Sequence, residues 1–245
     1  MSSKHLFALY SPLLQTKSGE VVHFTDQELW RRITQVLRLS TGDLVTLYNK
    51  NKALTVTLDA LTFNNKKSLI VGHIEQTQSV QQQLPFIHAI IGLTKREAFE
   101  EALYSCSQLG VTTITPLLTK RVHRNWLAEK ELVRLEKIMI AAGEQAKQFS
   151  LPTLNLPLEL ELLKAHKNLF VCAPEGKPLL LHLNELADAH NPERAIIIGP
   201  EGGFDDLEEQ FLASLKAQPI ALGKSILRTQ DATLVILGAW RCLPT

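Results

Sequence analysis

Residues 195–204 read Ala-Ile-Ile-Ile-Gly-Pro-Glu-Gly-Gly-Phe, an apolar run that passes directly into a glycine-rich turn. A short apolar run bounded by glycine and proline predicts a buried strand. Gly199, Gly202 and Gly203 allow the backbone to approach a ligand closely or to adopt a positive φ. Because ligands of open α/β sheets bind outside the carboxyl ends of the strands, this stretch predicts an α/β domain with a ligand-binding site at the turn.

Two common phosphate-binding motifs are excluded around this turn. The dinucleotide motif G-x-G-x-x-G fails because Glu201 occupies the position of its second glycine. Gly223-Lys-Ser resembles the end of a P-loop, but Gln218 stands where that motif needs its first glycine. Four acidic residues within 205–209 would also repel a phosphate at the start of the next helix. A neutral or cationic ligand therefore fits the turn better than a phosphate.

The sequence from residue 86 onward alternates apolar runs with amphipathic stretches. This alternation of strands and helices is typical of a mostly parallel sheet covered on both faces. Strands are expected near 86–93, 113–118, 169–173, 195–199 and 219–222, and helices near 95–109, near 129–148, from 205 and at 231–240.

The amino-terminal part is instead rich in short β-prone runs separated by turn residues. These runs lie at 6–10, 21–24, 44–48, 53–61 and 68–74. One helix interrupts them, and its start is predicted at a capping box formed by Thr25 and Glu28. The pattern predicts a small barrel or sandwich. A polar, glutamine-rich segment ending at Pro85 is typical of a linker, so the chain divides into 1–76, a linker at 77–85, and 86–245.

Composition narrows the class of protein further. The net charge is +1, which neither requires nor excludes a nucleic-acid partner. The three cysteines are too far apart for a CxxC pair and odd in number for a disulfide framework, which favours a reducing, cytoplasmic setting. No apolar run reaches the roughly 18 residues of a membrane span, so we expect a soluble protein. No metal site is expected, because the histidines show no ligand spacing.

Basic residues gather at two places that suit contact with a phosphate backbone. Residues 1–76 hold 9 Lys and Arg against 6 Asp and Glu, whereas residues 77–245 hold 17 against 19. A second cluster follows the strand expected at 113–118, where an indole could add base stacking to phosphate contact. The predicted RNA-binding residues are Arg31, Arg32, Arg38, Lys120, Arg121, Arg124 and Trp126. Two alternatives stay open: the charges form a solvated surface, or Trp126 anchors the next helix.

A second motif near the carboxyl terminus follows the glycine-rich turn, and the two motifs together are typical of one protein family. Residues 199–204 read GPEGGF, and residues 222–229 read LGKSILRT after one expected helix and one expected strand. Supporting matches are VLRL at 36–39, QLGV at 108–111 and AGEQ at 142–145. With these motifs the chain resembles, over nearly its whole length, the RsmE family of small-subunit ribosomal RNA methyltransferases in the SPOUT superfamily.

The resemblance implies an α/β protein with an N-terminal PUA-like β-barrel and a C-terminal SPOUT α/β domain tied in a deep trefoil knot. It implies S-adenosyl-L-methionine as cofactor, bound beside a homodimer interface, and methylation of uridine N3 in 16S rRNA of the small ribosomal subunit. The residues that the resemblance assigns to cofactor binding are Leu93, Thr94, Ala173, Gly199, Pro200, Glu201, Gly202, Gly203, Leu222, Gly223, Ile226, Leu227 and Arg228.

Three residues are candidates for catalysis in such a reaction. Arg228 could stabilise the uracil anion through its planar fork of donors, and Glu201 or Asp231 could accept the proton from the uracil nitrogen. Arg228 ranks first. The alternatives are a phosphate contact or a structural salt bridge for Arg228, and a capping role within its own turn for Glu201.

The chain also departs from the family pattern. Where the family usually reads LRTETA, this chain reads LRTQDA, with Gln230 and Asp231 at the changed positions, and Lys147-Gln148 replaces a usual glycine-arginine pair. These departures motivate three alternatives: a catalytically weakened knotted RNA-binding protein, a SPOUT methyltransferase with a different RNA target, or a small-molecule enzyme with a nucleotide-like ligand.

Overall fold

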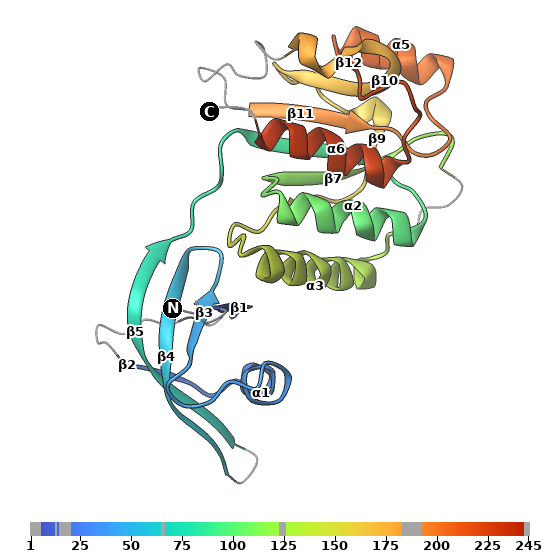
Figure 1. Ribbon diagram of the computed structural model, residues 1–245. Helices are drawn as coiled ribbons and strands as arrows, with labels where there is room; N and C mark the ends of the chain where they lie inside the picture. The colour runs from blue at the N-terminus through green and yellow to red at the C-terminus, as the bar shows by residue number, and fades with distance from the viewer. Residues whose placement is uncertain are drawn as a thin grey trace. The chain divides into compact units, whose positions relative to one another are not determined.

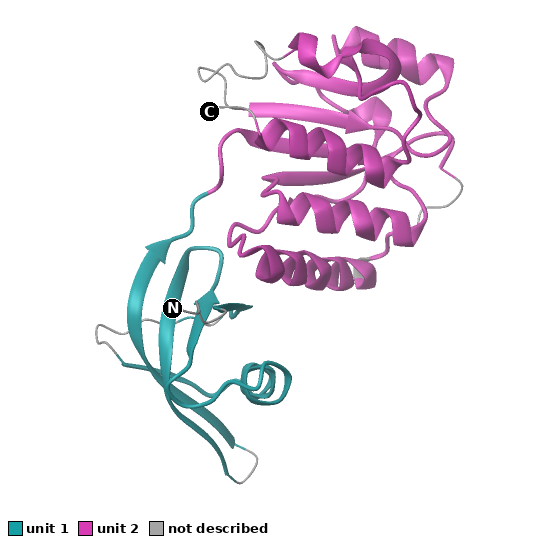
Figure 2. Cartoon of the chain, in the orientation of Figure 1, with its two compact units in different colours: residues 1–81 teal, residues 82–245 magenta. Residues whose placement is uncertain are grey.

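The computed structural model describes residues 6–12, 14, 21–64, 67–122, 126–182 and 193–242. The chain forms two compact units, residues 1–81 and residues 82–245 (Figure 2). Among the predicted site residues, Arg124 lies outside the described residues. No described helix is long and apolar enough to cross a membrane.

The first unit is built on a five-stranded sheet in the order β1-β3-β4-β5-β2. Its strands are β1 (Phe7–Tyr10), β2 (Val21–Phe24), β3 (Leu44–Tyr48), β4 (Lys52–Asn64) and β5 (Lys67–Ser79). Alternate residues of β4, namely Leu54, Val56 and Leu58, are buried in the core. Two register shifts along the β4–β5 pair act as bulges, which bend a sheet. All five predicted strands are confirmed, and β5 runs three residues past the expected end of this part at residue 76.

The helix of this unit begins differently from the prediction. Asp26 is its N-cap, because the Asp26 carboxylate accepts a hydrogen bond of 2.9 Å from the Leu29 amide. The predicted Thr25–Glu28 capping box is therefore wrong: with Asp26 as N-cap, its short side chain already satisfies the third amide of α1 (Gln27–Arg31). A π-helical turn, η1 (Arg32–Val36), follows directly, and Arg38 then adopts a left-handed backbone with φ of 55°.

The second unit contains the predicted parallel sheet. Its strand order is β12-β10-β11-β6-β7-β8, with β9 also paired to β7, and every pairing is parallel. Figure 1 shows the central strands side by side. The strands are β6 (Phe86–Gly92), β7 (Thr113–Leu118), β8 (Thr153–Leu154), β9 (Leu158–Glu159), β10 (Leu169–Pro178), β11 (Glu193–Ile198) and β12 (Gln218–Ala221).

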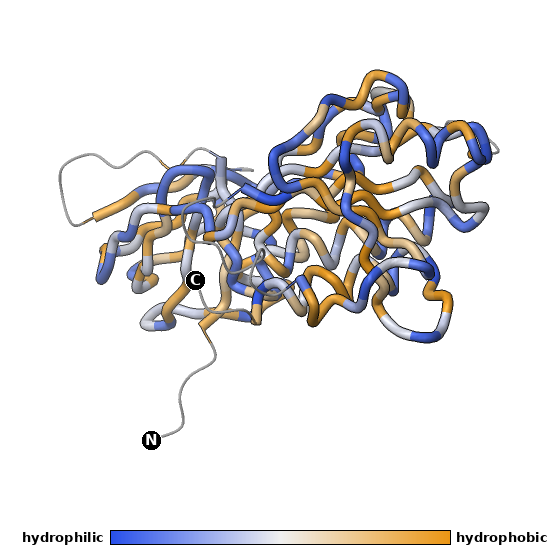
Figure 3. The backbone as a smooth tube through the Cα atoms, turned by 90° about the horizontal axis from the view of Figure 1, so that it is seen from above, coloured by the Kyte–Doolittle hydropathy of each residue, from blue (hydrophilic) through white to orange (hydrophobic). Residues whose placement is uncertain are grey.

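Helices cover both faces of this sheet, as the alternation of strands and helices predicted. Ile87, Ala89 and Ile91 of β6 are buried in one core together with residues of α2 (Arg96–Gln108), α3 (Glu129–Ala146) and α6 (Thr229–Arg241). Ile90, between them, is buried in a second core with residues of α5 (Asp206–Ser214) and η2 (Leu160–Leu162). A short 3-10 turn, η3 (Leu179–His182), follows β10. Hydrophobic positions accordingly gather along the inner strands of this unit (Figure 3).

A partly buried histidine, His88, is expected to make the stability of the second unit depend on pH. The Nε2 atom of His88 lies 2.7 Å from the Thr115 hydroxyl, and its ring meets the ring of His166 edge-on with centroids 5.2 Å apart. Burial, assisted by repulsion from His166, lowers the pKa of His88 to about 4. His88 is therefore neutral in the folded chain at pH 7.

We expect the free energy of unfolding to fall as the pH falls from about 6.5 to about 4. In this window the unfolded chain binds a proton at His88 that the folded chain excludes, which costs roughly 2–3 kcal/mol of stability. Guanidinium chloride unfolding at pH 7 and pH 4.5 measures the loss. His88→Asn should lose clearly less stability over the same interval, and an equal loss in both proteins would rule out His88 as the cause.

Candidate cofactor site

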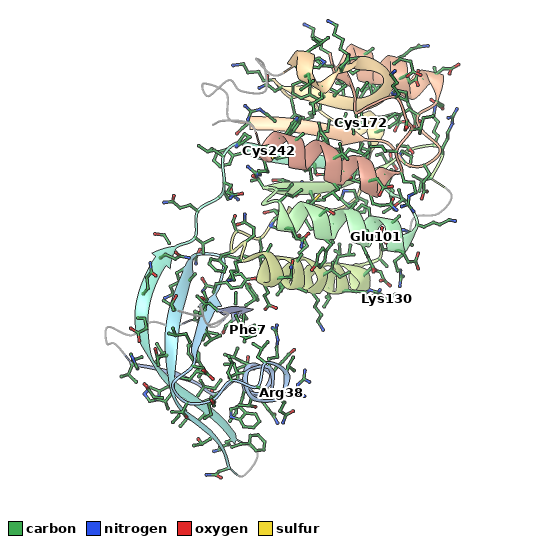
Figure 4. The ribbon with its side chains drawn as sticks, viewed as in Figure 1. Phe7, Arg38, Glu101, Lys130, Cys172 and Cys242 are labelled. Carbon is green, nitrogen blue, oxygen red and sulfur yellow. The ribbon has the colours of Figure 1, made fainter. Side chains whose placement is uncertain are left out.

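A pocket of about 220 Å³ lies at the carboxyl ends of three neighbouring strands, β10, β11 and β12. Cys172, labelled in Figure 4, stands in its wall on β10. Burial raises the pKa of the Cys172 thiol to about 12, so this side chain is a neutral part of the wall. The predicted cofactor residues that line the pocket are Ala173, Gly199, Pro200, Glu201, Gly203, Leu222, Gly223, Ile226 and Leu227.

The loop at 199–204 is shaped by close backbone contacts that only glycine permits. A Cβ atom added to Gly92, the last residue of β6, would lie 2.4 Å from the Pro200 nitrogen. A Cβ atom on Gly199 would lie 3.0 Å from the Phe204 ring. Gly203 has φ of +65°, a conformation that L side chains rarely adopt. The loop therefore turns sharply after β11 and stays pressed against the end of β6.

The second loop, residues 222–228, is fixed to the first by one side chain. The Thr229 hydroxyl, at the start of α6, donates a hydrogen bond of 2.8 Å to the Gly199 carbonyl oxygen, and Thr229 is buried. Gly223 has φ of +155°, and no other atom lies within 4 Å of the position of an added Cβ. Sequence reasoning missed Thr229 as a site residue, although its place directly after Arg228 in the quoted motif could have indicated it.

Four residues predicted to bind the cofactor do not line the pocket. Leu93 and Thr94 are buried at the end of β6, where the Leu93 amide donates to the Leu117 carbonyl oxygen and the Thr94 carbonyl oxygen accepts from the Trp126 indole. Gly202 faces Arg121, as described below. Arg228 is exposed on the outer side of its loop.

Two of the three catalytic candidates form a pair with each other. The Arg228 Nε atom donates to Asp231 Oδ2 at 2.9 Å, and both side chains are well exposed. This hydrogen bond raises the pKa of Arg228, which keeps the guanidinium charged. Glu201, the third candidate, is exposed and lines the pocket. Asp231 therefore pairs with an arginine outside the pocket lining, whereas Glu201 lies at the pocket itself.

The basic loop after β7 reaches the cofactor loop. The Lys120 amide donates to Glu208 Oε1 at 2.7 Å, and Arg121 Nη1 donates to the Gly202 carbonyl oxygen at 2.7 Å. Glu208, a buried carboxylate, also accepts from the Asp205 amide in a capping box that opens α5. Sequence reasoning noted the acidic helix start and missed this bridging role, although the D-x-x-E spacing at 205–208 could have indicated it.

Trp126 is engaged in packing between the strand and the helices. Its indole donates to the Thr94 carbonyl oxygen at 2.8 Å, its ring meets Phe99 edge-on at 5.9 Å, and the Arg96 guanidinium lies 5.3 Å from the ring centroid. These contacts fit the alternative in which Trp126 anchors a helix better than they fit a free stacking surface.

The predicted RNA-binding arginines of the first unit lie in and after its helix. Arg31 ends α1 and is exposed, Arg32 begins η1 and is half-buried, and Arg38 is exposed. Arg38 is labelled in Figure 4. A non-glycine residue in the left-handed region is uncommon and stores strain, which is frequent where a side chain is presented for function.

Comparisons with known proteins define the class. Residues 81–241 match the family described as RNA methyltransferase domain. A glycine-rich pocket at the carboxyl ends of a parallel sheet, within that domain, makes this chain an RNA methyltransferase by class.

The relatives specify the family within that class. Ribosomal RNA small subunit methyltransferase E from Mesomycoplasma hyopneumoniae is 31% identical over 207 residues, covering 83% of this chain and 87% of the relative. The protein of the same name from Synechocystis is 31% identical over 217 residues, covering 84% and 68%. The chain belongs to the ribosomal RNA small subunit methyltransferase E family.

Two solved structures share the fold over nearly the full length. The ribosomal RNA small subunit methyltransferase E from Neisseria gonorrhoeae, bound to S-adenosylmethionine, is 26% identical with a TM-score of 0.79, covering 98% of each chain. A methyltransferase structure from Legionella pneumophila, also with bound S-adenosylmethionine, is 27% identical with a TM-score of 0.81, covering 97% of each chain.

The pocket fits S-adenosylmethionine by its chemistry. Glu175, Glu201 and Glu209 line it, so its potential suits a ligand with sulfonium and ammonium charges. Apolar residues Ile220, Leu222, Ile226 and Leu227 line it as well, as an adenine ring requires. Exposed backbone at the two glycine loops supplies amide donors and carbonyl acceptors for the polar edges of the ligand.

Proposed function

We propose that this chain transfers a methyl group from S-adenosyl-L-methionine to N3 of a uridine in 16S rRNA of the small ribosomal subunit. The observation that carries the proposal is the pocket between the two glycine-bearing loops, joined by the hydrogen bond from Thr229 to Gly199, in a chain of this family. Both SAM-bound relatives support the cofactor assignment.

The cofactor would supply an electrophilic methyl group, and the chain's residues would place the acceptor in line with it. Gly199, Gly203, Leu222 and Gly223 would hold the cofactor mainly through the backbone. Positioning of this kind can supply roughly 7–11 kcal/mol of the barrier in a two-substrate reaction. The protein therefore needs few chemically active side chains.

We assign Arg228 to stabilising the uracil of the substrate. Asp231 engages the Arg228 Nε atom, which restrains the planar guanidinium and leaves the donors of its two terminal nitrogens for a second partner. They would stabilise the negative charge that develops on the uracil oxygens as the N3 proton leaves. Asp231 is engaged by Arg228, whereas Glu201 lines the pocket, so Glu201 is assigned as the proton acceptor.

Two finer features of the fold belong to this proposal. We infer a knot in the carboxyl-terminal part, because α6 does not pack beside its own strand β12 at the sheet edge but crosses to α2 on the flank of the central strands. We infer that the first unit is a PUA-like RNA-binding barrel, because a helical segment beside its bulged sheet presents exposed Arg31 and Arg38. A ribosomal substrate would place the reaction in the cytoplasm.

A homodimer is proposed from an exposed apolar face beside the pocket. Ile226 is 85% exposed, and Leu234 and Val235 on α6 are 51% and 43% exposed. Apolar residues gathered on one surface mark an interaction site more often than a solvated one. A second copy of this chain covering α6 would also shield the pocket-lining Ile226 from water.

We expect the double variant Leu234→Glu, Val235→Glu to shift the protein from dimer to monomer in multi-angle light scattering. Loss of the shield at Ile226 should weaken cofactor binding by about tenfold, equivalent to roughly 1.4 kcal/mol. The matched control is Leu162→Glu, an exposed leucine on η2 beneath the opposite face of the sheet. A wild-type protein that is monomeric at micromolar concentration would contradict the dimer.

Methyl transfer tests the function directly. Purified protein is incubated with methyl-labelled S-adenosylmethionine and small subunits from cells that lack the modification, and nucleosides from the RNA are then analysed by mass spectrometry. The expected product is N3-methyluridine. Cofactor binding without label in any RNA would favour the RNA-binding protein, label at another base would favour a different target, and no cofactor binding at high micromolar concentration would contradict methyl transfer altogether.

A further inference from the structure

Lys120 and Arg121, which follow β7, make three contacts with the cofactor loop and the start of α5. The Lys120 amide donates to Glu208 at 2.7 Å, the Lys120 ammonium lies 3.3 Å from Asp205 Oδ2, and Arg121 Nη1 donates to the Gly202 carbonyl oxygen at 2.7 Å. The first two contacts hold the loop at the start of α5. The third reaches into the glycine turn itself, between two residues that line the pocket.

Arg121 explains why residue 202 is glycine. Gly202 does not have a positive φ, so its backbone conformation does not require glycine. A Cβ atom at this position would lie 3.2 Å from the Arg121 Cβ and 3.5 Å from its Cδ. A Cβ atom on Gly203 would lie 3.9 Å from Arg121 Nη1. The arginine side chain therefore lies along the outside of the Gly202-Gly203 turn.

Arg121 contacts the glycine turn at a residue that does not line the pocket. Glu201 and Gly203 line the pocket, whereas Gly202 between them presents its carbonyl oxygen to Arg121. A guanidinium has five N–H donors, and the bond to Gly202 uses one of them. The Arg121 side chain is exposed, so its other donors can meet a second partner from solvent.

We propose that Arg121 is a positioning residue that couples RNA binding to cofactor binding. One side of its guanidinium holds the Gly202 carbonyl group, and the other side binds a phosphate of the RNA backbone. The proposal rests on the proposed function, because it assumes an RNA substrate and S-adenosylmethionine in the pocket. Planar, bidentate recognition of phosphate is the chemistry in which arginine exceeds lysine.

The coupling follows because RNA and cofactor would both bind to the same ordered form of the glycine turn. A phosphate that fixes the Arg121 side chain also fixes the glycine turn, so the cofactor then meets a turn that is already in place. Linkage makes the effect reciprocal, and RNA and cofactor each raise the affinity for the other by the same factor. Lys120 adds charge to the same loop, but its ammonium group is paired with Asp205 at the start of α5.

Equilibrium dialysis with labelled S-adenosylhomocysteine tests the coupling without turnover. Affinity is measured with and without small subunits that lack the modification. We expect the subunits to tighten binding to the wild-type protein by about fivefold to tenfold. In Arg121→Ala the subunits should change the affinity by less than twofold. Arg134→Ala, which removes an exposed arginine paired with Glu100 on other helices, should behave like the wild type.

Two further variants separate positioning from charge and from folding. Arg121→Lys keeps the charge but lacks the planar fork that directs donors to two partners in fixed geometry, so it should bind subunits nearly as tightly as the wild type and still lose the coupling. Gly202→Ala keeps the arginine and crowds it, and it should weaken the coupling as well. Thermal unfolding checks that each variant is folded.

Full tightening of the ligand by subunits in Arg121→Ala would overturn the proposal, and so would a wild-type protein in which subunits leave the affinity unchanged. Either result can occur in an enzyme that still methylates uridine N3, so the failure of this inference is distinct from a failure of the proposed function.

Discussion

Arg228→Ala should lower kcat for RNA methylation by about two to three orders of magnitude, while the affinity for S-adenosylmethionine changes less than threefold. Arg228 lies outside the pocket lining and is held by Asp231, so its removal leaves the cofactor contacts in place. Under the proposed function, what is lost is the charged donor assigned to the acceptor base. Single-turnover methylation of unmodified small subunits, beside calorimetry with the cofactor, measures both quantities.

Asp231→Asn is the matched variant for this experiment. An asparagine can still accept the hydrogen bond from Arg228 through its amide oxygen, but it lacks the charge that orients the guanidinium, so a smaller loss of about tenfold is expected. If Arg228→Ala lowered cofactor affinity and kcat by the same factor, the arginine would belong to cofactor binding or to support of the fold.

Arg241→Ala should cost about 3 kcal/mol of stability and lower the Tm of the second unit by roughly 6–12 °C. Arg241, in the last turn of α6, donates to the carbonyl oxygens of Leu84 and Pro85 before β6 and of Leu109 and Gly110 after α2. Its loss would leave these four carbonyl oxygens without their charged donor. Partial burial lowers the pKa of this guanidinium, yet it stays charged at neutral pH.

Arg134→Ala provides the comparison for stability. The Arg134 side chain is 53% exposed and is paired with Glu100, so its removal should cost less stability than the loss of four carbonyl contacts. Calorimetric unfolding of the two variants and the wild type gives the difference. Equal changes in Tm for Arg134→Ala and Arg241→Ala would show that the four carbonyl contacts add nothing.

Apolar periodicity predicted the strands of both units, but not where backbone pairing extends them. The strand expected at 169–173 runs to Pro178, because Lys177 and Pro178 pair with β12 after a register shift. Gly176 permits this, since a Cβ atom there would lie 2.6 Å from the Ile220 nitrogen. The residues that extend the strand are polar or small, so their sequence carries no strand pattern.

Part of the candidate cofactor site could also be predicted from the sequence. Glycine content located the turn at 199–203, because glycine is needed where a backbone turns sharply or meets a neighbour. The hydrogen bonds from Thr229 to Gly199 and from Arg121 to Gly202 join loops that are far apart in the chain. Such contacts depend on strand order, and no local pattern encodes them.

The contact between Gly92 and Pro200 has a consequence for how the chain folds. These residues meet only after β11 has entered the sheet between β10 and β6, a non-local pairing that forms slowly because a long loop must close first. We therefore expect the cofactor pocket to form late in folding. S-adenosylmethionine can stabilise the finished protein by mass action but cannot guide the early steps, so a chain that binds it has already completed its sheet.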